Sequence, residues 1–251
     1  MARRRFFVSE VREGGAVMEG DDARHLTRVL RVEVGQRYEL SDGTRAYLAE
    51  VAAARKEYVE FRIIEDLPPA PAVVRVSLLS SLIKFDHFEL LIEKATELGV
   101  AEIVPVIATR TETGLEKAVP KRMERWERIA LEASQQSRRD HLPKIWPAVP
   151  FGGALQWDKR WRYWLDEESG GVPLLAALPR ERKIEDSVAL LVGPEGGWTA
   201  SEREAAARQG WTRVSLGPQI LRAETASIAA LAVVMAAWMP EMGTARDNGT
   251  T

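Results

Sequence analysis

A proline-rich junction at residues 67–71 divides the sequence into two parts with different patterns. Prolines stand at positions 68, 69 and 71, and proline interrupts both helices and the interior of sheets. Before the junction, short alternating segments predict β-strands, with one short helix over 21–31. After it, apolar strands alternate with helical patterns, which is typical of a mostly parallel sheet covered by helices. The residues themselves therefore predict a small barrel followed by a doubly wound α/β sheet.

The second part contains predicted elements of clear type. The predicted strands cover 73–82, 103–107, 187–192 and 213–216, and the predicted helices cover 85–98, 120–137, 201–209 and 223–239. Between 142 and 185 the pattern is weak, although four of the eight tryptophans fall between 146 and 164.

Composition excludes several classes of site. The chain has no cysteine and only three well-separated histidines, so a thiolate or histidine metal site is not expected. Its 35 Lys+Arg against 37 Asp+Glu exclude nucleic-acid binding by bulk charge. The longest apolar run, 228–239, is shorter than the ~20 residues of a membrane span. The first residues lack the apolar core of an export signal, so we expect a cytoplasmic protein with neither metal nor membrane partner.

Two glycine-rich loops carry the strongest functional signal. Each of them, 193–198 and 217–222, follows a short apolar strand and precedes a helix. In parallel α/β sheets, ligands bind beyond the carboxyl ends of the strands, so both loops are expected to share one pocket. The alternative is that they are only tight strand-to-helix turns. Neither loop has the spacing of a phosphate-binding motif, and Glu195 would repel phosphate, so a small ligand with cationic character is favoured.

Several motifs together resemble the RsmE family. These are Leu191–Trp198 followed by Ser201–Glu204, Ser215–Gly217 and Ile220–Ala226, with further similar blocks at Arg28–Gly35, Glu93–Val100, Ile103–Val106 and Glu132–Ser137. Members of this family use S-adenosylmethionine to methylate N3 of a uridine in 16S ribosomal RNA of the small subunit. The resemblance covers most of the chain, apart from 142–185.

The resemblance implies a more specific fold than the pattern does. It implies an N-terminal PUA-like RNA-binding β-barrel over 1–69, a SPOUT α/β domain with a C-terminal trefoil knot over 70–242, and a tail over 243–251. Ordinary topology rules do not predict a knot. The resemblance also implies a homodimer, with which the apolar last helix is compatible, although a buried core helix explains that helix equally well.

The resemblance also implies residues for cofactor and catalysis. The S-adenosylmethionine site would consist of Leu191, Val192, Gly193, Pro194, Glu195, Gly196, Gly197, Ser215, Leu216, Gly217, Ile220, Leu221, Arg222, Thr225 and Ala226. Arg222 is the candidate for stabilising the uracil anion, and Glu224 for orienting Arg222 or accepting the N3 proton. The alternative is an ordinary ion pair between them at the start of the last helix.

Arginines are the expected contacts to RNA, because guanidinium groups bind phosphates and stack on bases. The candidates are Arg3, Arg4, Arg5, Arg24, Arg28, Arg31, Arg110 and Arg139. Among these, residues 24, 28 and 31 are expected on one face of the first helix. The alternative is a solvated charged face.

Three departures from the family pattern affect substrate contacts more than the cofactor site. Residues 108–112 lack an acid before Arg110, segment 82–88 differs from the usual lysine-rich version, and Gln219 stands where arginine is common. Two other functions remain open at this stage. One is a SPOUT methyltransferase acting on a ribose 2′-hydroxyl, and the other is an RNA-binding protein that keeps the fold without turnover.

Overall fold

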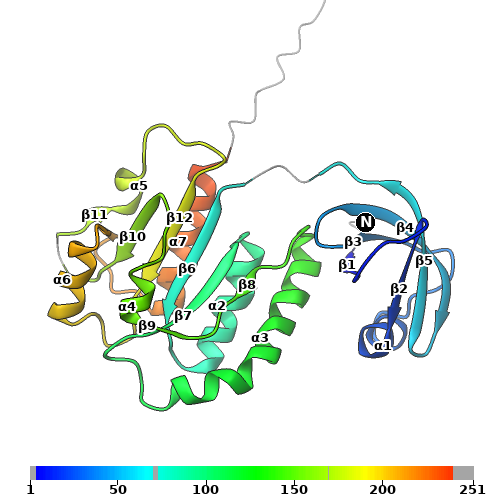
Figure 1. Ribbon diagram of the computed structural model, residues 1–251, viewed down its shortest axis with the longest axis horizontal. Coiled ribbons are helices and arrows are strands. Elements are labelled where there is room, and N and C mark those ends of the chain that lie inside the picture. The colour runs from blue at the N-terminus through cyan, green and yellow to red at the C-terminus, as the bar shows by residue number, and fades with distance from the viewer. Residues whose placement is uncertain (1–3, 70–72, 169, 240–251) are drawn as a thin grey trace, which may run out of the picture.

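The structure is a computed structural model that describes residues 4–69, 73–168 and 170–239. Two parts with separate cores, one on either side of the proline-rich junction in the sequence, lie along its longest axis (Figure 1). Arg3, part of the junction and the segment 240–251, which includes the predicted tail, lie outside the described residues.

The N-terminal part is a curled five-stranded sheet with one helix (Figure 1). Its strands are β1 (Arg5–Phe7), β2 (Gly15–Glu19), β3 (Arg37–Ser41), β4 (Ala46–Arg55) and β5 (Tyr58–Asp66), in the order β1-β3-β4-β5-β2. The register of β4 against β5 shifts twice, and such bulges bend a sheet. Because β1 and β2 remain the two edges, the described residues form a half-barrel rather than the closed barrel expected from the pattern.

The first helix, α1 (Gly20–Arg28), ends earlier than predicted. Arg31 adopts a left-handed backbone with φ of 52°, and the Val32 N–H donates to the Leu26 carbonyl at 3.1 Å. This is the geometry that ends a helix. The prediction that Arg31 shares a helical face with Arg24 and Arg28 is therefore wrong.

The second part contains an entirely parallel sheet. Its main path runs β11-β13-β10-β12-β6-β7-β8, and β9 also pairs with β7. The strands are β6 (Arg75–Ser81), β7 (Glu102–Ile107), β8 (Lys144–Ile145), β9 (Val149–Pro150), β10 (Trp161–Leu165), β11 (Val172–Pro173), β12 (Ser187–Val192) and β13 (Thr212–Ser215). The central strands β6 and β12 are buried along nearly their whole length. Strand β12 is apolar after its first residue, as expected for a strand covered on both faces, whereas β6 also buries three serines.

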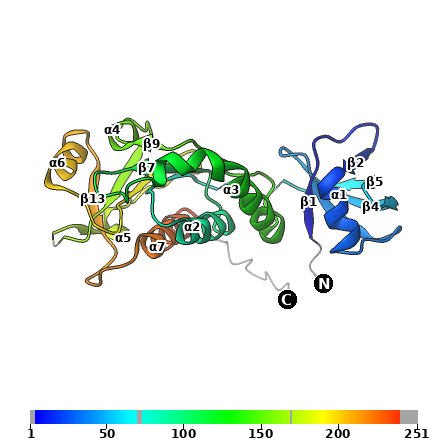
Figure 2. The same ribbon diagram turned by 90° about the horizontal axis from the view of Figure 1, so that it is seen from below.

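Helices cover both faces of this sheet (Figure 2). They are α2 (Phe85–Glu97), α3 (Leu115–Ser137), α4 (Phe151–Ala154), α5 (Leu174–Ala177), α6 (Ala200–Arg208) and α7 (Ala223–Ala237). One apolar core joins α2, α3, α5 and α7 to the sheet, and another joins α4 and α6 to the opposite face. The predicted doubly wound arrangement is confirmed at this level.

Two differences from the predicted elements have simple causes. Helix α3 begins at Leu115, after Gly114 with φ of 97°, rather than at Pro120. Pro120 is the sixth residue of the helix, where it removes one backbone hydrogen bond without ending the helix, so proline does not mark the first residue here. The weakly patterned stretch 142–185 contains β8 to β11 with α4 and α5, most of which are two to four residues long. Segments of that length are too short to show a period.

Side chains tie the curled sheet to the end of α3. The Arg5 guanidinium, on β1, pairs with Asp140 and lies 3.0 Å from a Glu39 carboxylate oxygen. The Ser41 hydroxyl also donates to the Asp140 carbonyl at 2.8 Å. The Arg5 and Asp140 side chains are only 11% and 10% exposed, so this contact belongs to the interior of the molecule.

Candidate functional site

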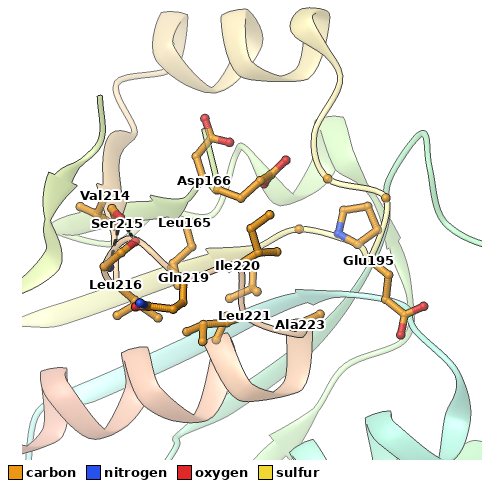
Figure 3. A pocket seen from close by; sticks show the side chains of 18 residues that line it. Leu165, Asp166, Glu195, Val214, Ser215, Leu216, Gln219, Ile220, Leu221 and Ala223 are labelled. Atoms are coloured by element: carbon orange, nitrogen blue, oxygen red, sulfur yellow. Dashed lines mark hydrogen bonds between the residues drawn. The ribbon is translucent and has the colours of Figure 1, made fainter. Parts of the chain in front are cut away.

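The carboxyl ends of β10, β12 and β13 lie side by side, because β10 pairs with both of the other strands in parallel. The loop after β12 and the loop after β13 therefore meet there, and they enclose a cavity of about 240 Å³ (Figure 3). The residues that line it are Leu165, Asp166, Glu167, Val192, Gly193, Pro194, Glu195, Gly196, Gly197, Val214, Ser215, Leu216, Gly217, Gln219, Ile220, Leu221, Ala223 and Ala226. The structure thus places both glycine-rich loops at one cavity.

Three of the residues predicted for the cofactor site do not line this cavity. Leu191 is fully buried in the core beneath the loop. Arg222 and Thr225 are exposed at the start of α7. The other twelve predicted residues do line it.

Sequence reasoning missed six lining residues: Leu165, Asp166, Glu167, Val214, Gln219 and Ala223. The first three lie at the end of β10 and directly after it, in the weakly patterned stretch. An aromatic strand, Trp161–Leu165, running into three consecutive acids is the signal that would have identified this third strand end.

Two glycines in the first loop are required by close approaches. A Cβ on Gly193 would lie 2.9 Å from the Trp198 indole ring. Gly197 has φ of 68°, and a Cβ there would lie 2.1 Å from Glu167 Oε1. The Trp198 side chain is fully buried, and its indole N–H donates to the Leu165 carbonyl at 2.8 Å. The loop after β12 is therefore packed directly against the end of β10.

Hydrogen bonds hold the far end of this loop. Thr199 caps α6 in a capping box with Glu202, whose Oε1 also accepts from the Thr109 backbone N–H at 2.8 Å. Burial raises the pKa of Glu202, but the hydrogen bonds from Thr109 and Thr199 outweigh it and lower this pKa below its ordinary value. The Glu202 carboxylate thus stays ionised and joins the turn after β7 to α6.

Among the described residues, the cavity wall carries acidic but no basic side chains. The Asp166 side chain is fully buried, and its carboxylate accepts hydrogen bonds from the Arg203 guanidinium. Arg213 Nε lies 2.8 Å from Asp166 Oδ2. Glu167 also contacts Arg203, at 3.1 Å. In Figure 3 the Glu195 carboxylate points away from the centre of the cavity. Such a wall disfavours phosphate, which basic side chains usually bind, and it fits an uncharged or cationic ligand.

Arg222 and Glu224 do not contact each other through any hydrogen bond or ion pair found among the described residues. Arg222 is the exposed residue that immediately precedes α7. Glu224 Oε1 instead lies 3.0 Å from His87 Nδ1, and the Glu224 side chain is only 8% exposed. The predicted direct orientation of Arg222 by Glu224, and the alternative of a simple ion pair between them, are both replaced by a contact with His87.

The predicted RNA-binding arginines fall into two groups. Arg139 donates to the backbone carbonyls of Thr96 and Val100, both at 2.7 Å, near the C-terminus of α2. Burial lowers the pKa of Arg139 to about 10. This guanidinium is occupied inside the protein, as is that of Arg5, so neither is available in this structure for RNA.

The remaining arginines reach solvent. Arg4, Arg28 and Arg31 are exposed, and Arg24 is partly exposed beside Asp21 and Glu57. Arg110 donates to the Gly196 carbonyl at 2.7 Å, which places an exposed cation at the rim of the cavity.

No cluster of three or more acidic, histidine or cysteine side chains suited to a metal occurs in 4–69, 73–168 or 170–239. None of the helices in those ranges has the length and apolar content of a membrane span.

Comparison with known proteins gives consistent results for both parts of the chain. Residues 70–235 match the family described as an RNA methyltransferase domain, and residues 19–64 match an RNA methyltransferase PUA domain. A protein of Bacillus subtilis named ribosomal RNA small subunit methyltransferase E is 32% identical, over 86% of this chain and 87% of its own length. The protein of the same name from Synechocystis is also 32% identical, over 84% of this chain and 70% of its own length.

Solved structures agree with these relatives. The ribosomal RNA small subunit methyltransferase E of Neisseria gonorrhoeae, bound to S-adenosyl methionine, has a TM-score of 0.83 at 29% identity and covers 94% of this chain and 98% of its own. A putative methyltransferase of Legionella pneumophila with bound cofactor SAM has a TM-score of 0.84 at 27% identity, with the same coverage. Sequence families, relatives and fold lead to one conclusion: the chain belongs to the ribosomal RNA small subunit methyltransferase E family.

Proposed function

We propose that this protein transfers a methyl group from S-adenosylmethionine to N3 of a uridine in 16S ribosomal RNA. The observation that carries the proposal is the cavity formed by two glycine-rich loops at adjoining strand ends, in a chain of this family. Relatives named for small-subunit ribosomal RNA methylation and two similar structures with bound cofactor support it.

The residues around the cavity fit this cofactor. Gly193 and Gly197 let the backbone approach closely, and Leu216, Ile220 and Leu221 give apolar surface for an adenine ring. The described residues that line the cavity include no basic side chain. Such a lining suits S-adenosylmethionine, because this ligand carries a positively charged sulfonium and an ammonium group. When bound, S-adenosylmethionine supplies an electrophilic methyl group.

The protein contributes alignment and charge. Methyl transfer is an in-line displacement, so holding the two partners in one geometry supplies much of the acceleration. Loss of the N3 proton to solvent leaves negative charge on the uracil oxygens, and we assign the Arg222 guanidinium to the stabilisation of this charge. The anion then takes the methyl group as the bond from methyl to sulfur breaks. Glu224 is too buried to meet the base directly, and we assign it to holding the first turn of α7.

We further propose that 1–69 is a PUA-like RNA-binding domain, and that 70–242 is a SPOUT domain with a trefoil knot. For the knot, the supporting observation is the path of the chain after β13. In the sheet, β10 separates β13 from β12 and β6. Helix α7, which follows β13 in the chain, packs on β6 and β12. Residues 216–222, which join β13 to α7, must therefore cross back over the carboxyl ends of β10 and β12. A homodimer acting in the cytoplasm, where ribosomal subunits assemble, completes the proposal.

The decisive experiment is nucleoside analysis of RNA from unmodified small subunits incubated with the protein and S-adenosylmethionine. Mass spectrometry should detect one N3-methyluridine per subunit. A ribose 2′-O-methyl nucleoside would instead indicate another SPOUT activity. No methylated nucleoside, together with no heat of cofactor binding by calorimetry, would leave only an RNA-binding protein.

We expect the paired substitution Arg28→Ala and Arg31→Ala to weaken binding to the small subunit. Both side chains are exposed. Each phosphate contact that is removed should reduce the slope of log K against log salt by about 1, so the paired variant should reduce it by about 2. Filter binding at several salt concentrations measures this slope. Arg128→Ala is the control, since Arg128 is already paired with Glu132 on α3. An unchanged slope in the paired variant would remove these two arginines from the RNA interface.

A further inference from the structure

A partly buried polar contact joins the first turns of two helices beside the cavity. His87, the third residue of α2, lies with its Nδ1 3.0 Å from Oε1 of Glu224, the second residue of α7. The His87 side chain is 27% exposed and that of Glu224 is 8% exposed. Because a carboxylate only accepts hydrogen bonds, Nδ1 carries the proton of this contact.

The surroundings make this contact hard to replace. Among the described residues, the only other charged group that pairs with the ring is Asp86, whose Oδ2 lies 3.6 Å from Nε2. The second carboxylate oxygen of Glu224, Oε2, is buried and has no hydrogen-bond partner among the residues that the structure describes. His87 therefore provides the hydrogen bond that compensates for burial of this carboxylate, and removing it would leave the charge unpaired.

The two sides of the α7 N-terminal turn have different roles. Ala223 and Ala226 line the cavity, whereas Glu224 and Ser227 are buried away from it. Ser227 Oγ lies 3.5 Å from Ser80 Oγ at the end of β6. This turn is thus fixed to α2 and β6 on one side while it forms the cavity wall on the other.

Arg222 immediately precedes this turn. Its guanidinium makes no hydrogen bond or ion pair with any other residue that the structure describes, so its place depends on the backbone that carries it. We infer that His87 is a positioning residue for methyl transfer: through Glu224 it fixes the first turn of α7 and thereby holds Arg222 between Leu221 and Ala223, which line the cavity. This inference rests on the proposed function.

The test compares two substitutions at one position. His87→Leu removes the donor, whereas His87→Asn keeps an N–H donor near the position of Nδ1. We expect His87→Leu to lower kcat at least tenfold with the Kd for S-adenosylmethionine within twofold, and His87→Asn to keep at least a third of wild-type kcat. His141→Leu, which replaces an exposed histidine, controls for loss of a histidine as such.

A double-mutant cycle separates positioning from a purely structural role. In the Arg222→Ala background, His87→Leu should cause no further loss of kcat. Equal kcat for His87→Leu and wild type, an equally large loss in His87→Asn, or losses that multiply in the double variant would each overturn the inference.

Amide hydrogen exchange gives a readout that does not need activity. His87→Leu should accelerate exchange at residues 220–226 while exchange in β6 and β12 stays unchanged. If wild-type protein methylates no RNA, the proposed function fails and this exchange pattern still tests the contact. Unchanged exchange at 220–226 would show that His87 does not fix the turn.

Discussion

Replacing Arg222 with alanine is expected to lower kcat for RNA methylation by about 10²–10³, the usual cost of removing one donor that stabilises a developing oxyanion. The Kd for S-adenosylmethionine should stay within twofold, because the Arg222 side chain does not line the cavity. Single-turnover methylation with saturating cofactor measures the chemical step, and calorimetry measures cofactor binding.

Two control variants interpret this result. Arg222→Lys keeps the charge but loses the planar fork of donors, so it should recover only part of the rate. Arg180→Ala removes a surface arginine that precedes β12, at the opposite end of that strand from the cavity, and should keep wild-type kcat. A wild-type kcat in folded Arg222→Ala would end the assignment of this residue to catalysis.

The elements that the sequence predicts well are those whose pattern is set by burial. Strand β12 has the predicted bounds, 187–192, because a strand covered on both faces must be apolar along its length. The loops after β12 and β13 can be identified because glycine and proline follow these strands directly. The meeting of these loops then follows from the parallel pairing of both strands with β10.

The third strand end at the cavity is not predictable in the same way. Strand β10 is five residues long and alternates with segments of two to four residues, so no period marks it. Its functional signal is the run of three acidic residues after Leu165. From the sequence alone these residues are expected to be exposed to solvent, because the contact between Arg203 and the buried Asp166 is visible only in the structure.

Two of the arginine predictions, those for Arg5 and Arg139, failed for a different reason. A positive charge in the sequence does not reveal whether its donors are already used. Arg139 binds two carbonyls near the end of α2, and Arg5 binds Asp140 and Glu39, so both stabilise the protein's own fold. Such contacts join residues far apart in the chain, which local pattern cannot detect.

Gly197→Ala is expected to weaken S-adenosylmethionine binding by at least tenfold. The left-handed backbone at Gly197, with φ of 68°, costs a residue with a Cβ about 1–2 kcal/mol, and a tenfold change in affinity corresponds to about 1.4 kcal/mol. The new Cβ would also overlap Glu167 Oε1, which contacts Arg203. Either the loop or Glu167 must move, and both belong to the cavity wall. Calorimetric titration measures the change in Kd.

The control is a glycine that also has a left-handed backbone but does not line the cavity. Gly43 has φ of 86° in the N-terminal part, and a Cβ there would meet no described atom within 4 Å. Gly43→Ala should therefore lower the melting temperature through backbone strain while the cofactor Kd stays unchanged. The double variant Gly197→Ala/Glu167→Ala separates the two causes at the cavity: partial recovery of affinity indicates the overlap with Glu167, and no recovery indicates backbone strain. Wild-type affinity in Gly197→Ala would mean that the cofactor does not bind against this loop, and the proposed site would have to be abandoned.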